Sequence, residues 1–384
     1  MWADARTNNY KLTNHELQTK MTNQLTKRIV AGLFTLSVLS CNTSDPEPSP
    51  YEAGIYVVNS GNFQDNNGSI SFLPRNSTTV STDIFNVANT RTLTGGVQDY
   101  TEIDGKGVIL VDNDKAGQDK IEIVESGTFK SLATFQSPDV ENPRYVVMAG
   151  PNKAYVSCWD ATGDFSNFFP KPGYILVLNL ASRTVTKRIP VTKGADRMVV
   201  AGSEVFVGSA GGERTLTIID TEKDEVRQPG LDVGVDTNPL AVDANSRLWA
   251  YASSANEMIR INTATKAVET RMKVGSSAKS PGAITISKDK QTFYFVNSFY
   301  DAADNYKQKG ETYSFRITDS SIPATRPFIR RLFTGLGVDP QTGILYAGVT
   351  PSYKQAGYVL RYQPDGVLID SVKAGIAPSR FYFR

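Results

Sequence analysis

Histidine and cysteine are scarce in this sequence of 384 residues. The single histidine is His15, and the two cysteines are Cys41 and Cys158. We expect the segment that contains His15 to be removed on export, which leaves the mature chain without histidine. Such a chain cannot build a histidine-based metal centre, a histidine-ligated haem or a Ser-His or Cys-His nucleophile. The sequence also shows no cluster of carboxylates that converges on one point, and on both grounds we expect no enzymatic activity, no catalytic residue, no metal and no cofactor.

An excess of charge of either sign is also missing. The chain has 41 basic and 39 acidic residues, and positions 1–40 hold five of the basic and two of the acidic ones. The remaining 36 basic and 37 acidic residues leave the mature part nearly neutral. Nucleic-acid-binding domains carry a strong basic patch. We therefore expect no nucleic-acid partner.

The sequence has no apolar run long enough to cross a bilayer as a helix. Its most apolar stretch, Ile29–Ser40, follows the basic pair Lys27-Arg28 and ends just before Cys41. A basic pair followed by a short apolar run is typical of a signal peptide. Residues 1–40 are therefore interpreted as a signal region, with Met21 as the expected true start.

Val38-Leu39-Ser40-Cys41 resembles the lipobox of bacterial lipoproteins, although leucine is usual where Val38 stands. The resemblance implies cleavage before Cys41 and attachment of lipid to its thiol, so that a lipid anchor is the only contact with a membrane. An ordinary secretory signal with an incidental cysteine is the alternative. A lipidated Cys41 leaves Cys158 without a disulfide partner, and we expect Cys158 to be a small buried residue.

Residues 41–50 form a hydrophilic segment rich in proline, which predicts an extended tether. Asp45 and Glu47 resemble the acidic export tags of surface-exposed lipoproteins in Bacteroidota. The resemblance implies a position on the outer membrane at the cell surface, and a periplasmic orientation stays open.

The rest of the chain shows no helical periodicity but short apolar runs separated by turn-forming residues. One kind of run recurs at intervals of 43 to 53 residues, centred on Tyr56, Ile109, Tyr155, Phe206, Trp249, Tyr294 and Tyr346. A strand-only repeat of this length is typical of a propeller blade of four strands. We therefore predict an all-β, seven-bladed β-propeller over residues 51–384.

Each repeat is interpreted as four strands, A to D from the axis outwards. In blade 3 the predicted strands are 143–149, 153–158, 174–179 and 184–191, and in blade 5 they are 239–243, 247–252, 257–262 and 267–274. Blade 1 opens directly with a B strand at Gly54, and the C-terminal run Ile376–Phe383 has the pattern of an A strand. We therefore expect the C-terminal strand to complete blade 1 and close the ring.

The strands of the form Gly-x-Tyr-Val-x-Asn, such as Gly54–Asn59, resemble those of the YVTN-repeat or YncE-like seven-bladed propellers. The resemblance covers residues 51–384 and concerns the fold more than the function.

Long connections between B and C strands are predicted to project from one face of the ring, among them the loop 298–309 of blade 6. They carry aromatic residues, which are costly on polar loops unless they pack or bind. We interpret them as an aromatic-lined cup for a bulky ligand, and the alternative is that some rings only cap the blades. The candidate ligand-binding aromatics are Phe63, Trp159, Phe165, Phe168, Phe299, Tyr300, Tyr306 and Tyr353.

The starts of the A strands should bring polar side chains to the same face, near the central channel. Arg144, Arg197 and Arg380 are candidate ligand contacts, although a polar ring around the channel could be purely structural. Asp99 and Asp196 also lie in A strands. The segment 112–119 contains spaced oxygen ligands but lacks the full calcium-loop pattern, and we interpret it as an ordinary solvated turn.

YncE-like lipoproteins of Bacteroidota include proteins that capture cobalamin for TonB-dependent transporters. The resemblance implies a lipid-anchored surface protein that captures a bulky small-molecule ligand, such as the corrinoid vitamin B12, for such a transporter. One alternative is a protein-interaction or surface-layer module with no small ligand. A lactonase-type hydrolase is a further alternative, which would need a carboxylate-bound metal at the channel mouth.

Overall fold

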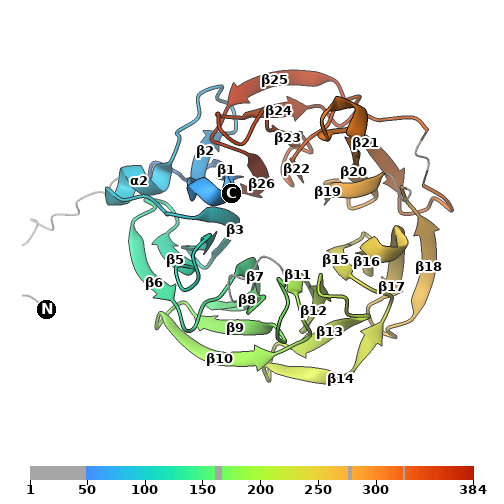
Figure 1. Cartoon of the computed structure of the whole chain (residues 1–384), viewed down its shortest axis with the longest axis horizontal. Coiled ribbons are helices and arrows are strands. Elements are labelled where there is room, and N and C mark those ends of the chain that lie inside the picture. Colours follow the sequence, from blue (N-terminus) through green and yellow to red (C-terminus); the bar gives the residue numbers. More distant parts are fainter. Residues whose placement is uncertain (1–48, 161–166, 276–278, 323–324) are drawn as a thin grey trace, which may run out of the picture. The chain divides into compact units, whose positions relative to one another are not determined.

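The computed structural model describes residues 49–160, 167–275, 279–322 and 325–384. Residues 50–384 form one compact unit of seven antiparallel sheets around a central axis. Figure 1 shows the sheets as blades of a ring, each with one strand at the axis and the others further out. The predicted all-β, seven-bladed propeller is confirmed. The signal region, the lipidation site Cys41 and the tether up to residue 48 lie outside the described residues.

Each blade runs from strand A at the axis to strand D at the rim. The A strands are β26 (Pro378–Phe383), β3 (Gly96–Ile103), β7 (Pro143–Gly150), β11 (Ala195–Ala201), β15 (Thr237–Val242), β19 (Ser280–Ile286) and β22 (Gly335–Val338). The B strands are β1 (Gly54–Asn59), β4 (Lys106–Asp112), β8 (Lys153–Cys158), β12 (Glu204–Ser209), β16 (Arg247–Ala252), β20 (Thr292–Asp301) and β23 (Leu345–Val349).

The outer strands follow the same order. The C strands are β2 (Ser69–Pro74), β5 (Lys120–Glu125), β9 (Tyr174–Asn179), β13 (Thr215–Asp220), β17 (Glu257–Asn262), β21 (Lys307–Arg316) and β24 (Tyr358–Tyr362). The D strands are β6 (Ser131–Gln136), β10 (Thr184–Pro190), β14 (Glu225–Asp232), β18 (Val268–Lys273) and β25 (Leu368–Lys373). In blades 1 and 6 the fourth position is held by the isolated bridges Phe72–Ser81 and Thr312–Ile329.

The core lies between neighbouring blades, because each sheet buries both faces. Every residue of β1 is buried, whereas β10 at the rim is mostly exposed. Tyr56 in β1 has no exposed surface, and its ring lies 4.9 Å from that of Tyr100 in the next blade. Large aromatic side chains fill the wedge between twisted blades, and such rings contribute strongly to core burial. This explains why the recurring B strands could be recognised from their apolar residues.

The C-terminal strand closes the ring as predicted. Strand β26 pairs antiparallel with β1, with Ile55 opposite Phe383 and Val57 opposite Phe381. Backbone hydrogen bonds extend the pairing beyond both ends of the two strands. Ser60 N donates to Ala377 O at 2.9 Å, and Arg384 N donates to Gly54 O at 3.0 Å. Blade 1 thus joins the two ends of the propeller, and no inner strand is left unpaired there.

Two features differ from the predictions. The connection 298–309 of blade 6 is not a loop, because β20 and β21 continue through it as a projecting hairpin in which Tyr300 pairs with Gln308. The hairpin was not recognised because charged and polar residues flank its three aromatic ones, so that no strand-like apolar run marks it. A short helix, α2 (Ile84–Asn89), follows blade 1, and its Ile84 and Phe85 are buried in the adjoining core. In the described part of the chain, no helix has the length and apolarity needed to cross a membrane.

Candidate functional site

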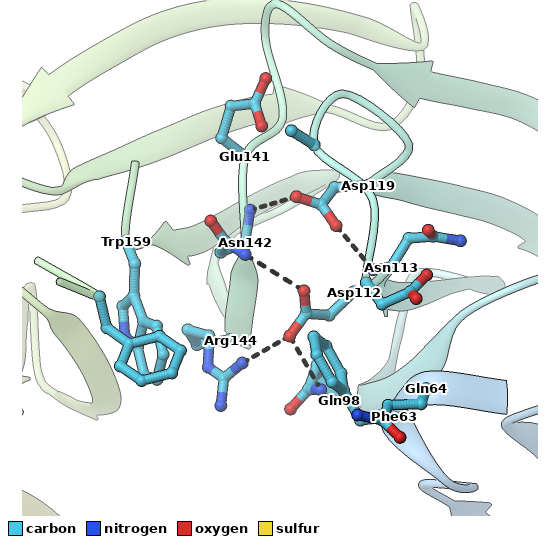
Figure 2. A pocket seen from close by; sticks show the side chains of 13 residues that line it. Phe63, Gln64, Gln98, Asp112, Asn113, Asp119, Glu141, Asn142, Arg144 and Trp159 are labelled. Atoms are coloured by element: carbon cyan, nitrogen blue, oxygen red, sulfur yellow. Dashed lines mark hydrogen bonds and ion pairs between the residues drawn. The ribbon is translucent and has the colours of Figure 1, made fainter. Parts of the chain in front are cut away.

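A pocket of about 410 Å³ opens between blades 1, 2 and 3 on the face that carries the B–C connections, here called the upper face. It is lined by Phe63 and Gln64 after β1 and by Trp159 and Phe168 after β8. The end of β4 and the turn that follows it contribute Asp112, Asn113, Asp114, Ala116 and Asp119. Gln98 in β3 and residues 141–144 around the start of β7 complete it. The pocket thus gathers residues from three blades, as Figure 2 shows.

Arg144 and Trp159 form a stacked pair on one side of the pocket. The guanidinium carbon of Arg144 lies 3.8 Å from the centre of the indole ring. The ring of Phe169 packs edge-on against Trp159 at 4.9 Å, and Trp159 N donates to Asn142 O at 3.2 Å. A partly desolvated cation–π contact contributes about 1–2 kcal/mol. The stack therefore holds both side chains in place before any ligand arrives.

Asp112, the last residue of β4, joins the polar groups of the pocket. It accepts hydrogen bonds from Arg144 Nη1 at 2.8 Å, Asn142 Nδ2 at 3.2 Å and Gln98 Nε2 at 3.3 Å (Figure 2). Only 4% of its surface is exposed. The interpretation of this segment as a solvated turn holds for its middle, where Lys115, Ala116 and Gln118 are exposed. It is wrong for Asp112 and Asp119 at its ends, which are buried against Asn142 and Arg144 of the next blade.

Asp119 forms the second carboxyl group of the polar floor. It is 2% exposed and accepts from the backbone N–H groups of Asn113 at 2.7 Å and Asn142 at 2.8 Å. Burial raises the pKa of Asp119 to about 7, and the nearby charge of Asp112 adds to the rise. Burial also raises the pKa of Asp112, against the opposing effect of Arg144. The floor of the pocket therefore changes its charge near neutral pH.

Three buried atoms of this site have no hydrogen-bond partner among the described residues. They are Asn142 Oδ1, Arg144 Nε and Trp159 Nε1, and the last two belong to the stacked pair. An unsatisfied buried polar group costs about 1–3 kcal/mol. These three atoms are available to hydrogen-bond a ligand that enters the pocket.

The central channel contains a second set of charged groups. The Arg380 guanidinium lies 3.9 Å from the centre of the Tyr145 ring and 3.4 Å from Asp99, and Arg197 Nε donates to the Tyr145 hydroxyl at 3.1 Å. Burial raises the pKa of Asp99, with Arg380 opposing, and burial likewise raises the pKa of Asp196. The guanidinium groups and carboxyls thus balance one another in the channel.

The channel mouth is itself a hollow of about 420 Å³, lined in part by Asp196, Arg197 and Arg380. Gln98 lines both this hollow and the pocket, so the two adjoin at that side chain. The sequence placed Arg144, Arg197 and Arg380 together near the channel. In the structure Arg144 lines the pocket, whereas Arg197 and Arg380 line the channel mouth.

The predicted aromatic residues divide into two groups. Phe63, Trp159 and Phe168 line the pocket, and Phe63 and Phe168 are 39% and 48% exposed at its rim. The other described candidates do not line the pocket. Phe299, Tyr300 and Tyr306 lie on the blade 6 hairpin, and Tyr353 lies on the blade 7 loop. Tyr300, Tyr306 and Tyr353 are 68%, 70% and 53% exposed. Phe165 lies outside the described residues.

Sequence reasoning missed Asp112, Asp119 and Asn142 as site residues. The spaced oxygens of segment 112–119 were the available signal, but their burial depends on the next blade. Cys158 is buried as predicted, and burial raises the pKa of its thiol to about 12. Within the described ranges, no three Asp, Glu, Cys or His side chains are grouped so as to hold a metal ion.

Comparisons with known proteins bear on the fold more than on the site. The family model described as "Domain of unknown function (DUF5074)" matches residues 53–373. No curated protein matches the chain.

Solved structures of low sequence identity share the fold. A quinonprotein alcohol dehydrogenase-like protein from Bacteroides thetaiotaomicron superposes with a TM-score of 0.62 at 17% identity, over 87% of this chain and 78% of that chain. A protein from Lactobacillus plantarum gives a TM-score of 0.61 at 12% identity, over 87% of this chain and 100% of that chain. Hydrazine synthase from Kuenenia stuttgartiensis gives 0.51 at 14% identity, over 71% and 85%. At these identities the likeness concerns the fold alone.

Proposed function

We propose that this chain, which belongs to the DUF5074 family, is a non-enzymatic binding protein that captures a bulky small-molecule ligand on its upper face. The observation that carries the proposal is the pocket of about 410 Å³, which combines aromatic side chains with a buried polar floor. Small-molecule sites have this makeup, with apolar walls and a few fixed polar groups. The carboxyl groups of Asp112 and Asp119 already hold hydrogen bonds within the protein, an arrangement that suits binding rather than catalysis.

The size of the ligand follows from the two hollows that adjoin at Gln98. Small-molecule pockets measure roughly 300–1,000 Å³. The pocket holds about 410 Å³ and the channel mouth about 420 Å³. A ligand that fills both has a flat portion against Trp159 or Phe168 and a polar portion toward Arg197 and Arg380. A corrinoid is a candidate because it is bulky, has flat faces and carries amide side chains.

The proposed place of action is the outer membrane. The lipobox-like sequence before Cys41 and the hydrophilic segment 41–50 support a lipid-anchored protein at the cell surface. From there a captured ligand would pass to a TonB-dependent transporter. Radiolabelled palmitate in the protein from whole cells, lost in a Cys41→Ser variant, would support the anchor. Equal labelling of the two proteins would contradict it.

Isothermal titration of the full-length, detergent-solubilised protein with cyanocobalamin tests the ligand class. We expect heat of binding at micromolar protein, and a Trp159→Ala variant that binds at least about tenfold more weakly, because it removes the stacking surface. Val200→Ala, which truncates an exposed side chain near an A–B turn, is the control and should bind as the wild type does. Absence of heat with the wild type would rule out a corrinoid. Equal affinity in Trp159→Ala would overturn the pocket as the site.

A protein-interaction role is the second candidate, and the blade 6 hairpin favours it. Tyr300 and Tyr306 are largely exposed on this hairpin. Tyrosine is enriched at protein interfaces because its ring is large and its hydroxyl remains hydrogen-bonded. A pull-down from outer-membrane extract without ligand should recover a transporter if this role holds. Loss of the transporter with Tyr300→Ala and Tyr306→Ala together would assign the contact to the hairpin, and unchanged recovery would exclude it.

A further inference from the structure

The charged side chains of the pocket are unequal in sign. Among its described lining residues one is basic, Arg144, and four are acidic: Asp112, Asp114, Asp119 and Glu141. Arg144 is already engaged, since it is paired with Asp112 at 2.8 Å and stacked on Trp159. The positive charge of Arg144 is therefore already paired within the protein. The remaining lining side chains that carry charge are acidic.

Two of the carboxyl groups are committed to the fold. Asp112 holds Arg144, Asn142 and Gln98, while Asp119 accepts two backbone N–H groups. Hydrogen bonds of this kind fix the floor and position the loop after β4 against blade 3. These two carboxyls shape the pocket rather than offer it a free oxygen.

The other two carboxyl groups retain free acceptors. Asp114 Oδ1 accepts from Asn66 Nδ2, and Glu141 Oε1 accepts from Ser137 Oγ at 2.8 Å. In the described part of the chain neither carboxylate makes an ion pair, and each keeps a second oxygen without a hydrogen bond. A third acceptor, Asn142 Oδ1, is buried at the same site and has no partner among the described residues. These acceptors call for N–H or N⁺–H donors.

The walls of the pocket complement such donors. Phe63 and Phe168 stand partly exposed at the rim, and Trp159 lies on the other side of the polar floor from Phe63 (Figure 2). Aromatic faces attract cations through their quadrupole, and proteins use such faces to recognise quaternary ammonium ligands. Nearby carboxylates add an attraction between opposite charges. A free carboxylate ligand could accept from Arg144 Nε and Trp159 Nε1, the two donors without a partner among the described residues, but it would also face the carboxylates of Asp114 and Glu141.

We infer that the pocket selects ligands in which a positively charged nitrogen adjoins a flat apolar group, and that it discriminates against carboxylate ligands. The inference rests on the proposed capture of a bulky ligand and adds the chemical class of the portion that enters this pocket. A corrinoid, whose side chains are neutral amides, lacks such a cation and would bind through its flat faces alone. The nitrogen is received by Asp114 and Glu141, and the flat group by Phe63 and Phe168. The channel mouth, with its two guanidinium groups, receives the remaining polar portion.

Three indole probes of nearly equal shape test this selection: tryptamine, tryptophol and indole-3-acetate. They differ at the side-chain end, which is a cation, a neutral alcohol and an anion. Binding to the full-length protein is measured by isothermal titration at pH 8 and low ionic strength, where the carboxyls are ionised and screening is weak. We expect tryptamine to bind at least about tenfold more tightly than indole-3-acetate, with tryptophol between them. Equal or tighter binding of indole-3-acetate would overturn the inference.

A double variant identifies the groups responsible. Asp114→Asn with Glu141→Gln keeps the shape of both side chains but removes their charges, and it should abolish most of the preference for tryptamine. Glu222→Gln, on an exposed C–D turn of blade 4 at the opposite face, is the matched control and should leave the preference unchanged. A preference that survives the double variant would show that these carboxylates do not select the ligand.

The same titrations separate the two proposals. If cyanocobalamin binds in a Trp159-dependent manner while the indoles show no charge preference, the capture function stands and the selection for cations is wrong. If neither cyanocobalamin nor any of the three indoles binds, the capture function is wrong and the selection fails with it.

Discussion

The upper face of the propeller has two unlike halves, both built from B–C connections with aromatic residues. On blades 1 to 3 the aromatics surround a buried network in which Asp112 is 4% exposed. On blade 6 they lie on a two-stranded hairpin whose ion pairs, such as Lys309–Asp301 at 2.7 Å, are largely in solvent. The comparison teaches that a loop aromatic becomes part of a site only where the neighbouring blade supplies buried polar groups beside it.

The two halves should differ most in how much unfolding free energy is lost when a carboxylate is removed. Asp112→Ala leaves the guanidinium of Arg144 partly buried without its partner, which costs about 3–5 kcal/mol of unfolding free energy. Asp301→Ala removes an ion pair that solvent screens, and it should lower the unfolding free energy far less. Urea-induced unfolding followed by far-UV circular dichroism measures both. Equal costs in the two variants would erase the distinction between the halves.

Truncation of the aromatic side chains should give a smaller difference in the same direction. Trp159→Ala loses its packing against Arg144 and Phe169, which we expect to cost about 2 kcal/mol or more of unfolding free energy. Tyr300→Ala removes a ring that is 68% exposed, and surface substitutions stay within about 0.5 kcal/mol. Thermal unfolding of the two variants side by side provides the measurement. A greater loss in Tyr300→Ala would mean that the hairpin, rather than the pocket, is the packed half.

The two halves also differ in how their stability responds to pH. The folded pKa of Asp119, about 7, lies above its ordinary value, so its contribution to stability is full below pH 4 and is lost as pH rises through 7. Asp301 behaves oppositely, because its hydrogen bond with Lys309 lowers its pKa, so its contribution is present at neutral pH and is lost on acidification.

Unfolding free energies of the wild type, Asp119→Asn and Asp301→Asn between about pH 2 and 8 separate these two effects. The difference in unfolding free energy between the wild type and Asp119→Asn should change most between pH 4 and 7. Over this range the wild type should become less stable relative to the variant as pH rises. For Asp301→Asn the wild type should lose its advantage below pH 4. A pH-independent difference for Asp119→Asn would show that this carboxyl is not perturbed in the folded protein.

Much of the fold could be predicted from the sequence. Strands 153–158, 174–179, 247–252 and 257–262 match β8, β9, β16 and β17 to the residue. They were recognisable because B and C strands are buried on both faces and therefore form continuous apolar runs between turns. The D strands were predicted to within a residue or two, since their exposed residues blur the ends. Closure by β26 followed from the A-strand pattern at the C-terminus.

The site was harder to predict than the fold. The aromatic residues Phe63, Trp159 and Phe168 could be selected because rings on polar loops are unusual. The burial of Asp112 and Asp119 could not be foreseen, since it is produced by Asn142 and Arg144 from another blade. No local pattern encodes which neighbour covers a loop, so a buried carboxyl pair and a solvated turn have the same sequence signature.

Hydroxyl-radical footprinting with mass spectrometry tests most directly the claim that the pocket half of the upper face binds the ligand. Oxidation is measured with and without saturating tryptamine, and again with cyanocobalamin. The account predicts that whichever of them binds protects Phe63 and Phe168, both exposed at the rim of the pocket, and that tryptamine leaves Tyr306 on the hairpin unchanged. Protection of Tyr306 by tryptamine with Phe63 and Phe168 unaffected would contradict it.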